Sequence, residues 1–279
     1  MRISVPAAVE RLRSGGLVAM PTETVYGLAA DALCEPAVHA IFAAKGRPAD
    51  HPLILHVADA DAARAHTHWD PRGDGLIDLW PGPLTLVLPR RGVPDVVTGG
   101  HDTVAVRVPD HPVALALLRG VGPLAAPSAN RFGRVSPTRA EHVEAEFPEI
   151  PVVDGGACAV GLESTILALI GPVPRLLRPG AVTLEVLMER LGPVDVGGDI
   201  AAPGTLPSHY APRGRVLLVP AGTPGAHLPT LPPEEYARGL YDALRACDDA
   251  GVDPIVCALA PPVGIGVAVN DRLRRAANR

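Results

Sequence analysis

The sequence predicts an α/β fold in which a large mixed sheet is followed by a smaller α/β unit. Short apolar runs alternate with amphipathic stretches along the chain, as alternating strands and helices do. Several successive runs are joined by connections too short for a crossover helix, so some neighbouring strands must be antiparallel. Hydrophobic residues make up 47% of the chain but aromatic residues only 3%, which predicts a core of Val, Leu, Ile and Ala.

Helices are expected where start or stop signals flank an amphipathic stretch, at residues 5–13, 35–45, 70–80 and 138–147. Gly15 ends the first of these, and Pro36 suits the first turn of the second. Asp70 stands at the N-cap of the third. Thr138 and Glu141 have the spacing of a capping box before the fourth.

Strands are expected where apolar or β-branched residues form a short run, at residues 17–20, 53–57, 84–88, 104–108, 124–126, 152–153, 166–169 and 175–177. Glycine and proline become frequent near residue 194, which predicts a linker over 194–213. A βαβα pattern follows, with strands at 215–219 and 254–257 and helices at 233–246 and 266–277. The chain is therefore expected to divide into domains 1–193 and 214–279.

Composition and charge exclude several classes of protein. The four cysteines form no C-x-x-C pair and have no zinc-site spacing. The charged residues Glu10 and Arg11 are incompatible with a signal peptide, and no apolar stretch reaches the roughly 18 residues of a membrane span. A net charge of −5 argues against a nucleic-acid-binding field over the whole surface. We expect a soluble, reduced, cytoplasmic protein with no membrane contact.

Neither common nucleotide fingerprint is present, but polar loops follow several predicted strands, where open α/β sheets bind ligands. Residues 21–28 offer hydroxyls, a carboxylate and a phenol for a small polar ligand, although Thr and Tyr are also common in strands. Residues 45–52 place two cations around a glycine, which suits phosphate but also complements a helix C-terminus. Residues 127–138 resemble an anion site, and capping explains the same serines. Residues 161–165 form the fourth of these polar loops.

Three single residues stand out in these patterns. Lys45 is the only lysine among 25 basic residues, and a compact ammonium is not interchangeable with a planar guanidinium at a phosphate. Its retention therefore indicates either a phosphate contact or chance. Arg107 lies inside an apolar strand and needs a carboxylate partner, which Glu23, Glu163 or a ligand could provide. His56 lies in an apolar run, where a histidine is most often part of the core.

The segments PTETVYGL, KGRP, WPGPLTLVL, VAVRVPDHP, PSAN, SPT, GLEST and LRPG, in this order, resemble the YrdC-like L-threonylcarbamoyladenylate synthases. The resemblance covers residues 10 to 190, and the linker segment SHYAP and the C-terminal end resemble the family's long, two-domain form. It implies a YrdC-like twisted mixed sheet with a concave, positively charged cavity, and a small Rossmann-like C-terminal domain. It also implies that L-threonine, bicarbonate and ATP are joined into threonylcarbamoyl-AMP, with release of pyrophosphate, for modification of tRNA.

The resemblance further implies roles for individual residues. The positions that match the threonine site are Thr24, His56, Arg107 and Ser164. Those that match the ATP site are Arg47, His51, Thr103, Ser128, Ser136 and Arg178, with His209 and Tyr210 covering the nucleotide from the linker. Lys45 and Arg47 would act as catalytic charges, Mg²⁺ would arrive with ATP, and the protein would contribute no metal ligands. A tRNA threonylcarbamoyl transferase complex is the expected downstream partner, with at most weak binding to RNA.

The chain departs from the family pattern at three points. His51 stands where the KGRP loop usually continues with Asn, Phe132 replaces a common Ser, and the second domain is short. A non-catalytic RNA-binding or ribosome-maturation module on the same fold is the alternative function, but such a module has no need for the four threonine-site residues together. A carbamoyl-adenylate-forming enzyme of hydrogenase maturation would carry acylphosphatase-like and zinc-finger segments, which this chain lacks.

Overall fold

The computed structural model describes residues 1–198, 200, 202–204 and 208–278. Within these residues, most of the chain surrounds one nine-stranded sheet in the order β1-β2-β6-β3-β5-β4-β7-β8-β9. Its strands are β1 (Val18–Met20), β2 (Gly27–Asp31), β3 (Ile54–His56), β4 (Leu84–Pro89), β5 (Thr103–Arg107), β6 (Leu124–Ala125), β7 (Thr165–Ala168), β8 (Arg175–Arg178) and β9 (Asp195–Val196). The pairs β3–β5, β4–β7 and β8–β9 are parallel and the other neighbours antiparallel, so the predicted mixed sheet is confirmed.

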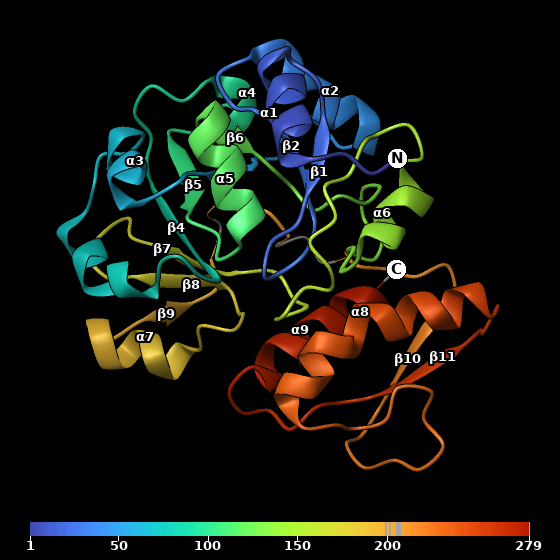
Figure 1. Cartoon of the computed structure of the whole chain (residues 1–279). Helices are drawn as coiled ribbons and strands as arrows, with labels where there is room; N and C mark the ends of the chain where they lie inside the picture. Colours follow the sequence, from blue (N-terminus) through green and yellow to red (C-terminus); the bar gives the residue numbers. More distant parts are fainter. Residues whose placement is uncertain (199, 201, 205–207, 279) are drawn as a thin grey trace.

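Helices pack around this sheet. They are α1 (Val5–Arg13), α2 (Glu35–Lys45), α3 (Ala60–Ala65), the 3-10 helix η1 (Pro71–Leu79), α4 (Asp95–Thr98), α5 (Pro112–Val121), α6 (Ala140–Glu146) and α7 (Leu184–Leu191). Figure 1 shows α1, α2, α4 and α5 gathered on the upper side of the molecule. Ile41, Leu55 and Val106 are fully buried in the main core, which is built almost entirely from aliphatic side chains, as the composition predicts.

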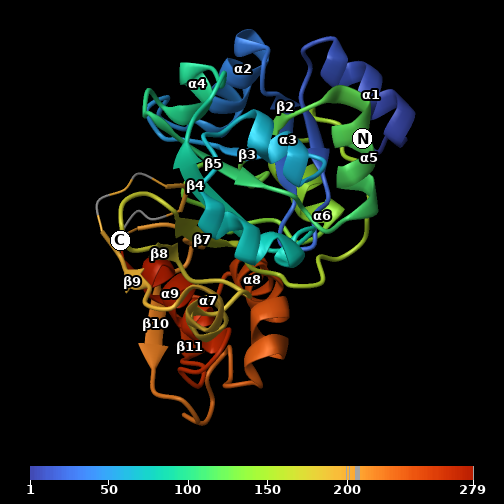
Figure 2. The same ribbon diagram turned by 90° about the vertical axis from the view of Figure 1, so that its left-hand side faces the viewer.

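The C-terminal unit is a two-stranded parallel sheet with two helices. Its elements are β10 (Val216–Val219), α8 (Pro233–Asp249), β11 (Ile255–Ala258) and α9 (Gly266–Ala277), which confirms the predicted βαβα order. In Figure 1 this orange and red unit lies below the large sheet, with α8 and α9 between that sheet and the β10–β11 pair. Figure 2 shows the same stacking from the side. Helices α8 and α9 therefore form the contact between the two units.

Some local predictions are wrong. Helix α6 begins at Ala140 after Arg139, and Thr138 does not cap it because the Thr138 hydroxyl donates to Asp242 of α8 over 2.8 Å. The predicted strand at 152–153 is reduced to isolated bridges from Val152. The segment after Asp70 is a 3-10 helix, although Asp70 caps it as predicted. The elements β2, α3, α4, α5, α7 and β9 were not expected, and β9 lies inside the predicted linker. No helix in the described residues is long and apolar enough to cross a membrane.

Candidate active site

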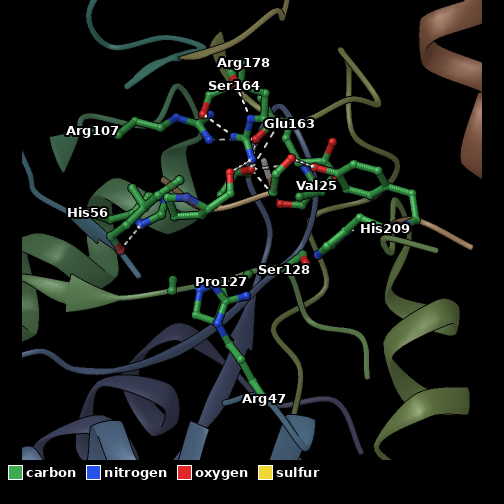
Figure 3. Close-up of a pocket in the computed structure, with 18 residues that line it drawn as sticks. Val25, Arg47, His56, Arg107, Pro127, Ser128, Glu163, Ser164, Arg178 and His209 are labelled. Atoms are coloured by element: carbon green, nitrogen blue, oxygen red, sulfur yellow. Dashed lines mark hydrogen bonds between the residues drawn. The ribbon is translucent and has the colours of Figure 1, made fainter. Parts of the chain in front are cut away.

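A cavity lies where the large sheet meets the segment that leads to the C-terminal unit. Most of the predicted site residues line it, namely Thr24, Arg47, His56, Arg107, Ser128, Ser164, Arg178, His209 and Tyr210. The sheet explains this convergence. His56 and Arg107 end the neighbouring parallel strands β3 and β5 and are partners in register, so they occupy the same edge and the same face. Figure 3 shows these side chains pointing into one space.

Arg107 is fixed by three acceptors from the protein. Its Nη2 lies 2.6 Å from Oε2 of Glu23, its Nη1 donates to the Thr24 hydroxyl over 2.8 Å, and its Nε donates to the Gly82 carbonyl over 3.2 Å. Of the partners that the sequence left open, the structure therefore gives Glu23, whereas Glu163 pairs elsewhere. The contact with Glu23 is an ion pair rather than a hydrogen bond, and a guanidinium has five N–H donors, so N–H groups of Arg107 remain for the oxygens of a ligand.

Arg47 and Arg178 supply positive charge without a carboxylate partner. Arg178 donates to Ser164 O and Oγ (3.0 and 3.1 Å) and to Pro203 O (2.9 Å), all neutral acceptors. Arg47 donates to the Pro52 carbonyl over 2.9 Å, and its buried Nε has no hydrogen-bond partner. Burial lowers the pKa of Arg47 to about 10, so it remains charged at neutral pH. Within the described residues, neither guanidinium lies within ion-pair distance of an acid, which makes the cavity a site for anions.

His56 is a neutral group in this cavity. Burial, and secondarily the charge of Arg107, lower the pKa of His56 to about 3. The ring lies 3.2 Å from the Ile54 carbonyl through Nδ1. A neutral imidazole can still donate one hydrogen bond and accept another, so His56 can orient a polar substrate without adding charge.

The buried His56 predicts a loss of stability in acid. At pH values between 3 and 6.5, His56 binds a proton in the unfolded chain but stays neutral in the folded chain, because its ordinary pKa of 6.5 falls to about 3 on folding. The free energy of unfolding should therefore fall as the pH falls from 6.5, by up to about 1.4 kcal/mol per pH unit. The free energy of unfolding, measured by urea denaturation between pH 7 and pH 4.5, should depend less steeply on pH for His56→Gln than for the wild type. If the exposed control His39→Gln reduced the pH dependence of the unfolding free energy equally, the acid sensitivity could not be assigned to His56.

Lys45 lies behind the cavity rather than on its wall. Its Nζ donates to the backbone carbonyls of Ser128 and Asn130, and the side chain is 3% exposed. Burial lowers the pKa of Lys45 well below its usual value. The Lys45 amino group therefore holds the loop that presents Ser128 to the cavity, and a direct phosphate contact by Lys45 stays a prediction.

Lys45→Arg should damage this loop. A guanidinium is larger than the ammonium and does not fit between two fixed carbonyls, so we expect a cost of about 1–3 kcal/mol in stability together with reduced turnover. Urea denaturation and a turnover assay measure the two effects separately. Unchanged values in both would mean that the single lysine reflects codon composition alone.

Three other predicted residues lie off the wall of the cavity. Ser136 is fully buried and donates to Oε1 of Glu163 over 2.6 Å. Thr103 begins β5, at the opposite end of the strand from Arg107. The ring of His51 lies 5.4 Å from that of Phe132, the residue that departs from the family pattern. ATP contacts by these three residues stay predictions.

The segment around His209 and Tyr210 closes the cavity on the side of α8. The His209 ring meets the Phe132 ring edge-on at 5.9 Å, and the Tyr210 ring stacks on Tyr241 of α8 at 5.8 Å. Phe132 also lies 5.5 Å from the Arg47 guanidinium. Both linker side chains are thus held by aromatic contacts. Among the other lining residues, Thr22, Val25, Gly27, Pro127 and Glu163 belong to the loops singled out in the sequence, whereas sequence reasoning missed Ile54, Ala126, Pro203 and Gly204.

Metal-binding clusters of three or more His, Cys, Asp or Glu are absent from the described residues. Glu163 is the single acid on the cavity wall in that part of the chain, and its carboxylate is occupied by protein donors. Any Mg²⁺ would therefore have to be held by the phosphates of a bound nucleotide and by water, as Mg²⁺ often is.

Two family models match the chain. Residues 10–180 match the Sua5–YciO–YrdC model, described as telomere recombination, and residues 226–278 match a model described as the C-terminal domain of threonylcarbamoyl-AMP synthase. The chain belongs to the YrdC-like threonylcarbamoyl-AMP synthase family. The resemblance seen in the sequence motifs is therefore confirmed.

Known members of this synthase family match closely. The threonylcarbamoyl-AMP synthase of Bacillus subtilis is 39% identical, over 98% of this chain and 92% of that protein. The crystal structure of Pyrococcus abyssi Sua5 complexed with L-threonine has a TM-score of 0.91 at 40% identity and covers 99% of this chain and 96% of its own. A putative threonylcarbamoyl-AMP synthase of Mycobacterium tuberculosis is 40% identical over 67% of this chain and 89% of its own length.

Proposed function

We propose that the protein joins L-threonine, bicarbonate and ATP into L-threonylcarbamoyl-AMP and releases pyrophosphate. The observation that carries this proposal is a single cavity in which Arg107 lies beside the other threonine-site residues, and in which Arg47 and Arg178 have no carboxylate partner within ion-pair distance among the described residues. In Figure 3, Arg107 and Arg178 lie at one end of this cavity and Arg47 at the other. The similarity to a Sua5 protein complexed with L-threonine supports the amino-acid end.

The threonine end is built for a zwitterion. N–H donors of Arg107 that make no hydrogen bond within the protein bind the carboxylate, and the neutral His56 and the Ser164 hydroxyl orient the rest of the amino acid. Ser164 is itself held, since its Oγ lies 2.7 Å from the Thr85 hydroxyl and accepts from Arg178. No acid lies free to bind the ammonium within the described wall of the cavity, which favours loss of a proton and leaves the amine as a nucleophile.

The reaction then proceeds in two steps. The threonine nitrogen attacks the carbon of CO2, supplied by dehydration of bicarbonate, and the N–C bond forms as the nitrogen loses a proton. A carbamate oxygen next attacks the α-phosphorus of ATP, and the bond from that phosphorus to the bridging oxygen breaks as pyrophosphate leaves. The protein contributes positioning and charge rather than a covalent intermediate.

MgATP enters as the substrate, with the metal on its phosphates. Arg47 and Arg178 offset the negative charge that develops on the departing pyrophosphate. His209 and Tyr210, which line the cavity from the linker, exclude water from the carbamate. The product then serves a separate transferase complex that modifies tRNA. A non-catalytic RNA-binding module on this fold would have no use for this gathering of polar groups in one cavity.

Pyrophosphate release tests the proposal. Purified protein with MgATP and bicarbonate should release pyrophosphate when L-threonine is added and stay silent without it. Serine in place of threonine measures the selectivity for the methyl group. Pyrophosphate release that does not depend on the amino acid, or no release under any condition, would contradict the proposed function.

A further inference from the structure

Glu163 connects the cavity to the C-terminal unit. Its carboxylate accepts from the Ser136 hydroxyl over 2.6 Å, from the Tyr241 hydroxyl over 2.8 Å and from Nε of Arg272 over 2.8 Å. Tyr241 belongs to α8 and Arg272 to α9, and both side chains are completely buried. Within the described residues, the second unit thus supplies two of the three side chains that donate to this carboxylate on the cavity wall.

Arg272 is held as firmly as Glu163. Its Nη1 donates to Asp271 over 2.8 Å, its Nη2 reaches the Glu163 carbonyl at 3.4 Å, and its guanidinium lies 5.3 Å from the Tyr210 ring centroid. One side chain of α9 therefore contacts two residues that line the cavity, Glu163 and Tyr210. Arg272 is therefore a buried contact between α9 and the cavity wall, not an arginine on an exposed helix face.

The neighbour of Glu163 makes this pairing important for the site. Ser164 accepts from Arg178 through both its carbonyl and its hydroxyl (Figure 3), and its neighbour Glu163 accepts from Arg272, so these two adjacent residues contact two buried arginines. Burial raises the pKa of Glu163, but the charges of Arg272 and then Arg178 outweigh it and bring the pKa to about 2. A buried carboxylate that loses its partner is strongly unfavourable. After Arg272, Arg178 is the cation whose charge acts most strongly on Glu163.

We propose that Arg272 is a positioning residue of the active site, which keeps the Glu163 carboxylate engaged so that Arg178 stays available to an anionic substrate. The C-terminal unit then completes the cavity wall and sets its charge. This inference rests on the proposed function for the identity of the anion, MgATP. Without Arg272, Glu163 pairs with Arg178, cancels a cation of the cavity and displaces Ser164.

Nucleotide affinity tests this role without relying on turnover. Calorimetry with the non-hydrolysable α,β-methylene analogue of MgATP should give a dissociation constant about 10- to 100-fold weaker for Arg272→Met than for the wild type, because a charged contact from Arg178 is lost. The double variant Glu163→Gln/Arg272→Met should recover affinity to near the wild-type value, since the competing carboxylate is gone. Arg272→Lys, which keeps the charge, should fall between wild type and Arg272→Met.

The controls separate this role from general stability. Arg274→Met removes an exposed arginine from the same helix and should bind the analogue as the wild type does. Wild-type affinity in Arg272→Met, or a double variant that binds no better than the single one, overturns the proposal. If Arg272→Met fails to fold, recovery of folding and affinity in the double variant still supports it, and failure of both variants overturns it. A wild type that binds the analogue but never releases pyrophosphate with threonine contradicts the proposed function instead.

Discussion

Replacing Arg107 by lysine is expected to lower threonine-dependent turnover by about 30- to 100-fold at low threonine concentration. The charge opposite Glu23 is kept, so the buried acid does not lose its partner and the fold is retained. A lysine ammonium has three donors at one point and cannot reach Glu23, Thr24, Gly82 and a ligand carboxylate together. Losing the charged hydrogen bonds to the substrate costs about 2–3 kcal/mol, which is the source of the expected fold-change.

Steady-state kinetics distinguishes this loss from a general defect. The KM for threonine should rise by most of that factor, while calorimetric binding of the nucleotide analogue stays close to the wild-type value. The conservative variant Glu23→Gln retains an acceptor beside Arg107 and should lose far less activity. An equal loss of threonine and nucleotide binding in Arg107→Lys would show that Arg107 acts through the fold rather than through the substrate.

Arg47→Met should reduce kcat by about 100- to 1000-fold, the range observed when a preorganised donor to a developing negative charge is removed. The buried Nε of Arg47 has no partner within the described residues, and a ligand oxygen would satisfy it. Methionine keeps much of the packing against Phe132 and removes the charge. The variant should therefore fold normally, and single-turnover measurement of pyrophosphate release should show the slow step.

A matched surface arginine provides the control for this result. Arg119 lies exposed on α5, away from the cavity, and Arg119→Met should leave kcat unchanged. If Arg47→Met releases pyrophosphate at the wild-type rate with saturating substrates, Arg47 has no part in the transition state. The positive charge that offsets the departing pyrophosphate would then have to come from Arg178.

The elements that could be predicted from sequence carry local signals. Helix α2 has Pro36 in its first turn, and the apolar strands β4 and β5 are bounded by turn residues. Strand β2, with the sequence GLAAD, gave no such signal because alanine and glycine are poor strand formers, and it is fixed by pairing with β1 and β6. Helix α5 was hidden because PVALALLRGV reads as a continuous apolar run.

The site residues, too, separate into those that sequence motifs predict and those that only tertiary packing places. The family motifs place His56 and Arg107 at strand ends and Thr24 in the loop between β1 and β2, and the sheet brings these residues to one cavity. The donors to Glu163 could not be predicted because Tyr241 and Arg272 lie in ordinary amphipathic helices, and only tertiary packing aims them at the cavity. Thr138 shows the same effect, since a capping pattern in sequence became a contact with Asp242 in the fold.

Product identification tests the central claim most directly. The protein is incubated with L-threonine, MgATP and ¹³C-bicarbonate, and the products are separated and weighed by mass spectrometry. We expect threonylcarbamoyl-AMP that carries one ¹³C atom, formed in equal amounts with pyrophosphate. Pyrophosphate accompanied by AMP alone, or an adenylate without the label, would contradict the account.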